Sequence, residues 1–185
     1  MALPSIPNVG SQLDRAVAAY LAGLGINGGA VYPAFSVATK TYPVVKVVSR
    51  QSSQDPELTG NEKFRVNIEV RQSAASAAKP VNLESQRVAL DLLVGQIMAA
   101  MMQTQDGGTL DYVCALITAA GISLSTTGTA TQKANNADMA AFSCLYMRYI
   151  GATRGEPEEE NLAWVEIRTF EITAAPVAGA GPSII

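Results

Sequence analysis

The sequence predicts an α+β protein with an antiparallel sheet of about four strands, helices on one face of that sheet, long polar loops and an extended C-terminal arm. Three observations support this prediction. Four segments have the alternation or the β-branched content of strands, and they lie in two pairs along the chain. Other segments repeat apolar residues at helical spacing. Turn-forming residues separate all of these segments.

A single domain accounts for the whole chain. The chain has 185 residues and 48% hydrophobic content, which is enough for one core, and nothing in it indicates a second. We therefore expect one domain over 1–185. Its predicted parts are an N-terminal helix (1–25), a strand pair (42–72), helices (82–121), a second strand pair (141–174) and a C-terminal arm (175–185).

The N-terminal helix has one apolar stripe and a glycine-rich end. Asn8 or Ser11 can cap it, and the stripe consists of Leu13, Val17, Tyr20, Leu21 and Leu24. The glycines at its end, Gly23, Gly25 and Gly28, formally match the GxGxxG pattern of dinucleotide-binding folds. That pattern must follow a strand and open a helix, whereas here it follows a helix. We interpret these glycines as a helix cap and loop.

The first strand pair alternates between apolar and charged residues. In "YPVVKVVSR" (42–50), Val45 and Val47 point to one side, and Lys46 and Arg50 to the other. In "EKFRVNIEVRQS" (62–73), the inward row is Phe64, Val66, Ile68 and Val70. The polar connection between them contains Asp-Pro and Thr-Gly turn signals, which favour antiparallel pairing.

Two helices are predicted in the middle of the chain. The first begins after a cap at Asn82, is the longest of the chain, and has a wide apolar face made of Leu83, Val88, Leu90, Leu92, Leu93, Ile97, Met98 and Met101. The second runs from about Leu110 to Ala120, with Thr109 as its cap and Gly121 as its stop. The polar stretch 125–138 that follows is predicted to be a surface loop.

The second strand pair, "FSCLYMRYIGA" (142–152) and "LAWVEIRTFEITA" (162–174), flanks an acidic tip. We expect an inward row of Leu145, Met147, Tyr149, Val165 and Ile167. The expected outward row is Tyr146, Arg148, Trp164, Glu166 and Arg168. Phe170 and Ile172 do not fit this parity and suggest a bulge near the end of the last strand.

The outward rows of the four strands together make a positively charged face. We expect it to contain Lys46, Arg50, Arg65, Arg71, Arg148 and Arg168 against Glu69 and Glu166. Two interpretations stay open, a solvated face with weak cross-strand ion pairs and an interface for another protein. DNA contact is a third, less favoured because Tyr146 and Trp164 are the only aromatic platforms expected there. The whole chain has a net charge of −3, without the basic excess typical of nucleic-acid binders.

The acidic tip is the second candidate interface, through Glu158, Glu159 and Glu160. A metal enzyme could use these carboxylates together with Glu156, but a run of acids at a hairpin tip is usually a solvated surface. If the protein forms a ring, the tip of one copy can meet the positive row of the next.

Several functional classes are excluded by composition. The chain has no histidine, which removes Ser-His-Asp and Cys-His catalysis and most hydrolytic zinc sites. Its two cysteines, Cys114 and Cys144, lack a CxxC spacing, and we expect both to be small buried hydrophobic residues. We predict no enzyme activity, no cofactor and no metal. The N-terminal residues lack the pattern of a signal peptide, and no segment is apolar enough for a membrane span, so we expect a soluble, unexported protein without a membrane partner.

In their order and residue patterns, these segments resemble those of the tail terminator or tail-completion proteins of long-tailed bacteriophages. The resemblance extends from about Gln12 to Ile172 and is carried by "YPVVKVVSR", "EKFRVNIEVRQS", "NLESQRVALDLLVGQIMAAMM" and "LAWVEIRTFEI". The helix around Tyr112 and the Thr/Ala-rich stretch after it lengthen the family's usual pattern.

The resemblance implies a structural virion protein located in the tail and assembled in the host cytoplasm. Its expected partners are further copies in a ring, usually of six, the tail tube protein and the head connector proteins, and DNA would pass through the ring without sequence recognition. The alternatives are a head-tail joining or head-completion protein and, in a different class, a nucleic-acid-binding module that uses the basic sheet face.

Overall fold

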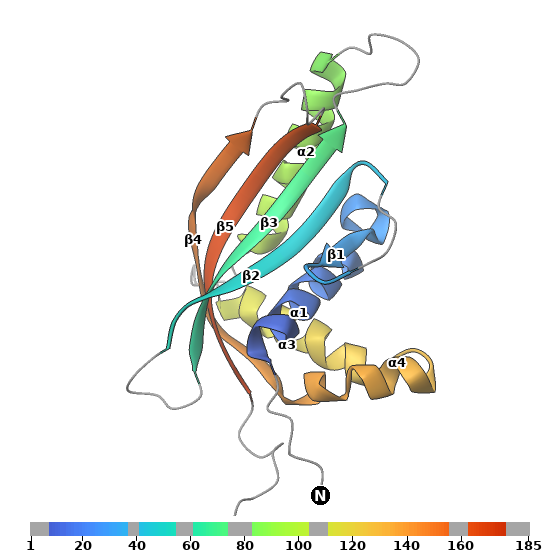
Figure 1. Ribbon diagram of the computed structural model, residues 1–185, viewed down its shortest axis with the longest axis vertical. Helices are drawn as coiled ribbons and strands as arrows, with labels where there is room; N and C mark the ends of the chain where they lie inside the picture. The colour runs from blue at the N-terminus through green and yellow to red at the C-terminus, as the bar shows by residue number, and fades with distance from the viewer. Residues whose placement is uncertain are drawn as a thin grey trace, which may run out of the picture.

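The computed structural model describes residues 8–36, 41–54, 61–73, 83–103, 111–155 and 163–176. It has two layers, a mixed five-stranded sheet and helices that pack on one face of that sheet (Figure 1). The other face has no cover among the described elements. We call the helix-covered side the inner face and the uncovered side the outer face.

The sheet consists of β1 (Val31–Pro33), β2 (Val44–Gln54), β3 (Glu62–Ser73), β4 (Phe142–Gly155) and β5 (Ala163–Pro176). Their order is β1-β2-β3-β5-β4. The pairs β2/β3, β3/β5 and β4/β5 are antiparallel, as predicted, whereas β1 lies parallel to β2. The expectation of about four antiparallel strands therefore misses β1, because three residues that include a proline show no period.

The inner face of β2 and β3 is the apolar row that the sequence predicts. All six of its predicted members are buried: Val45, Val47, Phe64, Val66, Ile68 and Val70. Helix α1 (Val9–Gly23) packs Leu13, Val17 and Leu21 into the same core. Burying each such side chain contributes roughly 1.5–3 kcal/mol, so this contact anchors α1 to the sheet.

Helix α1 begins and ends as predicted. The Asn8 side chain accepts a hydrogen bond from the Ser11 amide at 3.0 Å, which satisfies one of the free donors of the first turn. The helix ends at Gly23, and Gly25 has a φ of 74°, a left-handed conformation that glycine adopts without strain. The predicted glycine cap and loop is confirmed.

A buried carboxylate also fastens α1 to β2. Asp14 is only 5% exposed, and its Oδ1 accepts a hydrogen bond from the Ser49 amide at 2.6 Å. Desolvation by burial raises the pKa of Asp14 to about 6, although the hydrogen bonds from Ser49 oppose that rise. The contact therefore depends on pH near neutrality.

The middle helices are α2 (Leu83–Met101) and α3 (Asp111–Thr126), and α2 is the longest described helix, as expected. The prediction that Gly121 stops the second helix is wrong, because α3 continues five residues beyond it. A Cβ at that position would lie 3.0 Å from side-chain carbons of Ala16 and Met139, so close packing explains the glycine. The predicted caps Asn82 and Thr109 lie outside the described residues.

The predicted surface loop 125–138 contains regular structure. Helix α4 (Ala130–Asn135) starts with a capping box in which Thr129 and Gln132 bond each other's backbone amides. Two short 3₁₀ helices, η1 (Ile26–Gly29) and η2 (Ala137–Ala141), complete the described elements. All of the α4 side chains are exposed, which explains why no apolar period announces this helix.

The predicted parity of β5 is wrong. Ile68 pairs with Arg168 and Val70 with Glu166, so Trp164, Glu166 and Arg168 belong to the inner face, and Val165 and Ile167 to the outer face. Inward alternation continues without interruption through Phe170 and Ile172, which are both fully buried.

The register shifts lie in β4 instead, between Cys144 and Tyr146 and between Tyr149 and Gly151. Leu145, which was expected to face inward, lies at the first of these shifts and is 43% exposed. Met147 is buried and Tyr149 half-buried on the inner face, as expected.

The predicted C-terminal arm starts later than expected. Residues 175 and 176 continue β5 and pair with Ser143 and Phe142 at the start of β4. The remainder of the arm, 177–185, lies outside the described residues, as does the acidic connection 156–162.

Candidate protein interface

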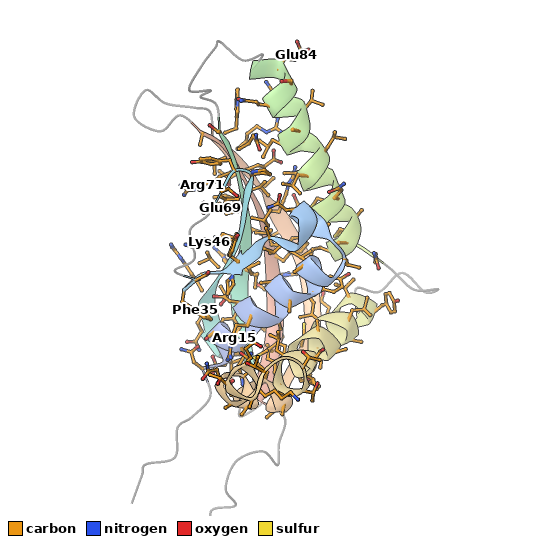
Figure 2. The ribbon with its side chains drawn as sticks, turned by 90° about the vertical axis from the view of Figure 1, so that its right-hand side faces the viewer. Arg15, Phe35, Lys46, Glu69, Arg71 and Glu84 are labelled. Carbon is orange, nitrogen blue, oxygen red and sulfur yellow. The ribbon has the colours of Figure 1, made fainter. Side chains whose placement is uncertain are left out.

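The outer face of the sheet carries most of the predicted interface residues. Figure 2 shows the side of the sheet from which Lys46, Glu69 and Arg71 project, opposite the helices. The strand registers add Arg50, Arg65 and Arg148 to the same face. Five of the six predicted basic residues therefore lie together.

Arg168 is the exception, because it lies on the inner face with Glu166. The registers also bring two charged residues to the outer face that sequence reasoning missed, Lys63 and Glu171. The described outer face thus has six cationic and two anionic side chains, on a chain whose net charge is −3. The sequence does contain a signal for Glu171. If Phe170 and Ile172 are taken as the inward residues of β5 instead of Val165 and Ile167, Glu171 between them must face outward.

In one part of the outer face, a carboxylate neutralises part of the positive charge. Lys46 is directly opposite Glu69 across β2 and β3, and Arg71 forms an ion pair with the same carboxylate. A hollow of about 310 Å³ lies here, lined by these three residues together with Tyr42 and Val44. Ion pairs this exposed contribute at most about 1 kcal/mol each.

A second hollow on the outer face is not neutralised in this way. It measures about 560 Å³ and is lined by Arg50, Gln51, Arg65, Asn67 and Thr169. Arg50 and Arg65 are directly opposite each other across β2 and β3. Like charges in this position repel, so the hollow is suited to an anion.

The inner face contains a charged group centred on a buried carboxylate, which we call the Glu166 cluster: Asp91, Arg154, Glu166 and Arg168. The Glu166 carboxylate is 1% exposed and receives hydrogen bonds from both arginines, at 2.7 Å in the case of Arg154 Nη2. Arg154 also reaches Asp91 of α2 at 2.8 Å. The hydrogen bond to Glu166 is the main cause that raises the pKa of Arg154, which further favours the charged form of its guanidinium.

Trp164 also lies on the inner face rather than on the outer one. The guanidinium of Arg87 from α2 stands 5.7 Å from its ring centre, a cation–π distance. Of the two aromatic residues predicted for the outer face, only Tyr146 lies there, and it is 52% exposed. This weakens the case for a base-stacking surface.

Helix α2 presents a second apolar surface away from the sheet. Its buried stripe includes Leu90, Val94 and Ile97, but Val88 and Leu92, expected in the core, are 51% and 66% exposed. Among the exposed residues, an uncharged set recurs at alternating spacings of four and three, as in a coiled coil: Val88, Leu92, Gly95 and Ala99 of α2, and Met102 directly after it. We call these five residues the α2 ridge. Three of the five, Val88, Leu92 and Met102, are large exposed apolar side chains, which makes the ridge a candidate protein contact.

The remaining candidate residues are placed only in part. Glu156, Glu158, Glu159 and Glu160 lie outside the described residues. Among the described residues, no three Cys, Asp or Glu side chains gather in a group that could hold a metal ion. Within the same ranges, no helix is long and apolar enough to cross a membrane. Cys114 and Cys144 are both buried free thiols, as predicted.

A scan against protein-family models and a search of curated proteins find no match to this chain. The function is therefore inferred from the fold, from its two exposed surfaces and from the resemblance of its segments.

Proposed function

We propose that this protein is a structural subunit of a bacteriophage tail, a ring protein that ends the tail tube and joins it to the head connector. The sequence features that support this proposal are the order and the residue patterns of the segments between Gln12 and Ile172. The function needs binding surfaces and a rigid framework rather than a catalytic centre. Further copies of the chain, the tube protein and the connector are the proposed partners.

The observation that best supports the proposal is the presence of two unlike surfaces on opposite sides of one molecule. The outer face of the sheet is positively charged and uncovered, and the α2 ridge on the far side of the helix layer is apolar (Figure 2). Two different surfaces on one subunit can bind two different neighbours, as a ring protein between tube and connector must, and head-to-tail contacts generate closed rings when the rotation between copies closes. Six copies are the number that the resemblance implies.

Assembly as a function of concentration tests this proposal. Native mass spectrometry and electron microscopy should find closed rings at high concentration or at the ends of tail tubes, even if the dilute protein is monomeric, because association shifts with concentration by mass action. Tail tubes formed in its presence should have a defined length. A protein that stays monomeric, does not bind tubes and leaves their length unchanged would contradict the proposal.

A matched pair of variants tests the role of the α2 ridge. Leu92→Asp replaces an exposed side chain and should leave the monomer folded while it raises the concentration needed for ring formation. Gln96→Asp, one turn further along α2 on an exposed position outside the ridge, is the control and should assemble normally.

One observation favours a second function, a nucleic-acid-binding module. Six cations against two anions on one sheet face would attract a phosphate backbone. Binding to duplex DNA that weakens steeply with salt, in a protein that forms no ring, would favour this function. A head-tail joining protein would instead form rings that bind the connector but not the tube.

A further inference from the structure

One row of side chains on the outer face carries unbalanced charge. The registers place four residues side by side across β2, β3, β5 and β4, and we call them the Arg65 row: Arg50, Arg65, Glu171 and Arg148. Glu171 forms an ion pair with Arg148, with 2.9 Å between Arg148 Nε and Glu171 Oε1. Within the described ranges, Arg50 and Arg65 have no ion pair of their own. The row therefore has two positive charges in excess.

The groups around these two arginines are mainly hydrogen-bond donors. The Thr169 hydroxyl donates to Asn67 Oδ1 at 2.9 Å, which leaves the Asn67 amide nitrogen to donate into the hollow. Two guanidinium groups beside an amide donor match the oxygens of carboxylates, which arginine binds through paired hydrogen bonds. A bound carboxylate would also remove the repulsion between the opposed arginines.

The same chain contains such carboxylates in the connection between β4 and β5. Residues 156–160 contain four glutamates and follow Gly155, which pairs with Val165. The Arg65 row lies six residues further along β5, at Glu171, which corresponds to about 20 Å along the strand. Gly155 and Val165, at the described end of this strand pair, are thus remote from the Arg65 row, which favours contact with the connection of another copy over contact within one copy.

We propose that the Arg65 row binds the acidic connection 156–160 of a second copy of this chain, in a head-to-tail contact. This inference depends on the proposed ring-forming function and names the contact that would hold neighbouring subunits in register. A protein partner is favoured over DNA because the chain is acidic overall and because Trp164 lies on the inner face. The contact should weaken as salt rises, since the Debye length is about 8 Å at physiological ionic strength.

The test uses two charge-reversed variants of the full chain. The face variant is Arg50→Glu with Arg65→Glu, and the connection variant is Glu158→Lys with Glu159→Lys and Glu160→Lys. Each alone should need at least about tenfold higher concentration to associate, measured by sedimentation velocity and native mass spectrometry at low salt. Thermal unfolding should stay near that of the unmodified monomer, because Arg50 and Arg65 are exposed. If the face variant does not fold, Arg50→Gln with Arg65→Gln replaces it.

Mixing the two variants is the decisive measurement. In a head-to-tail contact the unaltered face of one variant meets the unaltered connection of the other, and the two altered surfaces are again of opposite charge. An equimolar mixture should therefore associate close to the unmodified protein, although neither variant does so alone. Lys133→Glu on the exposed helix α4 is the matched control for a charge change elsewhere and should associate normally.

Several results would overturn the contact. Normal association of both variants, or no recovery on mixing, would exclude it while leaving ring formation and the proposed function intact. An unchanged association with reduced binding of the face variant to a fluorescent DNA duplex would assign the row to DNA. If Asp55→Asn with Glu57→Gln alone reproduced the weaker association of the face variant, while the connection variant associated normally, the acidic partner would be the β2–β3 connection and not 156–160. Failure of the unmodified chain to associate under any condition would overturn the proposed function as well.

Discussion

Strand β5 separates two groups of arginine and glutamate that have the same chemistry and different surroundings. In the Glu166 cluster on the inner face, the Glu166 side chain is 2% exposed and lies between two guanidinium groups. In the Arg65 row on the outer face, the Arg148 side chain is 56% exposed and its partner Glu171 is 19% exposed. The carboxylate at the centre of the first group is buried beside α2, whereas the second group lies on the uncovered face of the sheet.

The difference shows that pairing in a sheet does not determine what a charge contributes. A buried carboxylate has lost its hydration, so its stability depends on keeping both partners. An exposed pair is screened and contributes little to folding. Exposed arginines without a partner therefore cost the monomer little and remain free to bind another molecule, whereas the buried cluster serves the fold.

The largest expected effect separates the two faces within one strand. Ile68→Asp places a charge on the fully buried inner row of β3 and should destabilise the fold by more than about 4 kcal/mol, enough to prevent soluble expression. Asn67→Asp, the adjacent outer position, should change stability by less than about 1 kcal/mol, because an aspartate oxygen can still accept the hydrogen bond of Thr169. Soluble yield and urea unfolding measure both variants. Equal tolerance would mean that the faces are assigned wrongly.

The next effect compares the two carboxylates of β5 directly. Glu166→Gln should cost roughly 3 kcal/mol, because it leaves Arg154 and Arg168 beside a neutral amide in the inner layer. Glu171→Gln, the same change five residues away on the outer face, should cost less than about 1 kcal/mol. Equilibrium unfolding in urea distinguishes them, and similar losses would contradict the contrast between the clusters.

A smaller, pH-dependent effect concerns a buried carboxylate that lacks the paired arginines of Glu166. Burial raises the pKa of Asp14 from 3.8 in the unfolded chain to about 6 in the folded protein. The folded state therefore holds this proton more tightly. Protonation of Asp14 therefore stabilises the folded state fully below about pH 4. This stabilisation, at most about 3 kcal/mol of unfolding free energy, is lost as the pH rises through about 6.

Asp14→Asn removes that dependence and can keep the hydrogen bond from Ser49, since an amide oxygen also accepts. The stability of the variant relative to the unmodified protein should rise between pH 4 and pH 7. Urea unfolding of both proteins at several pH values measures the difference. A constant difference across this range would show that Asp14 does not titrate there.

The sequence by itself determined the α+β class, the antiparallel pairs β2/β3 and β4/β5, the capped N-terminal helix and the alternation of β3. These features depend on neighbouring residues, through side-chain period, capping and turn chemistry, which are local properties of the chain. The absence of histidine and the surplus of arginine on the strands were equally visible, and they led to an interface rather than an active site as the candidate.

Only the tertiary structure decided which face of β5 is buried, that α3 continues through Gly121, and that Val88 and Leu92 are exposed. Each depends on residues distant in sequence. The register with β3 turns Arg168 inward, and the packing of α1 and η2 around Gly121 removes the space for a side chain. Alternation with a period of two divides a strand into two rows but does not tell which row faces the core. The register with the neighbouring strand therefore decided that Glu166, and not Val165, points inward.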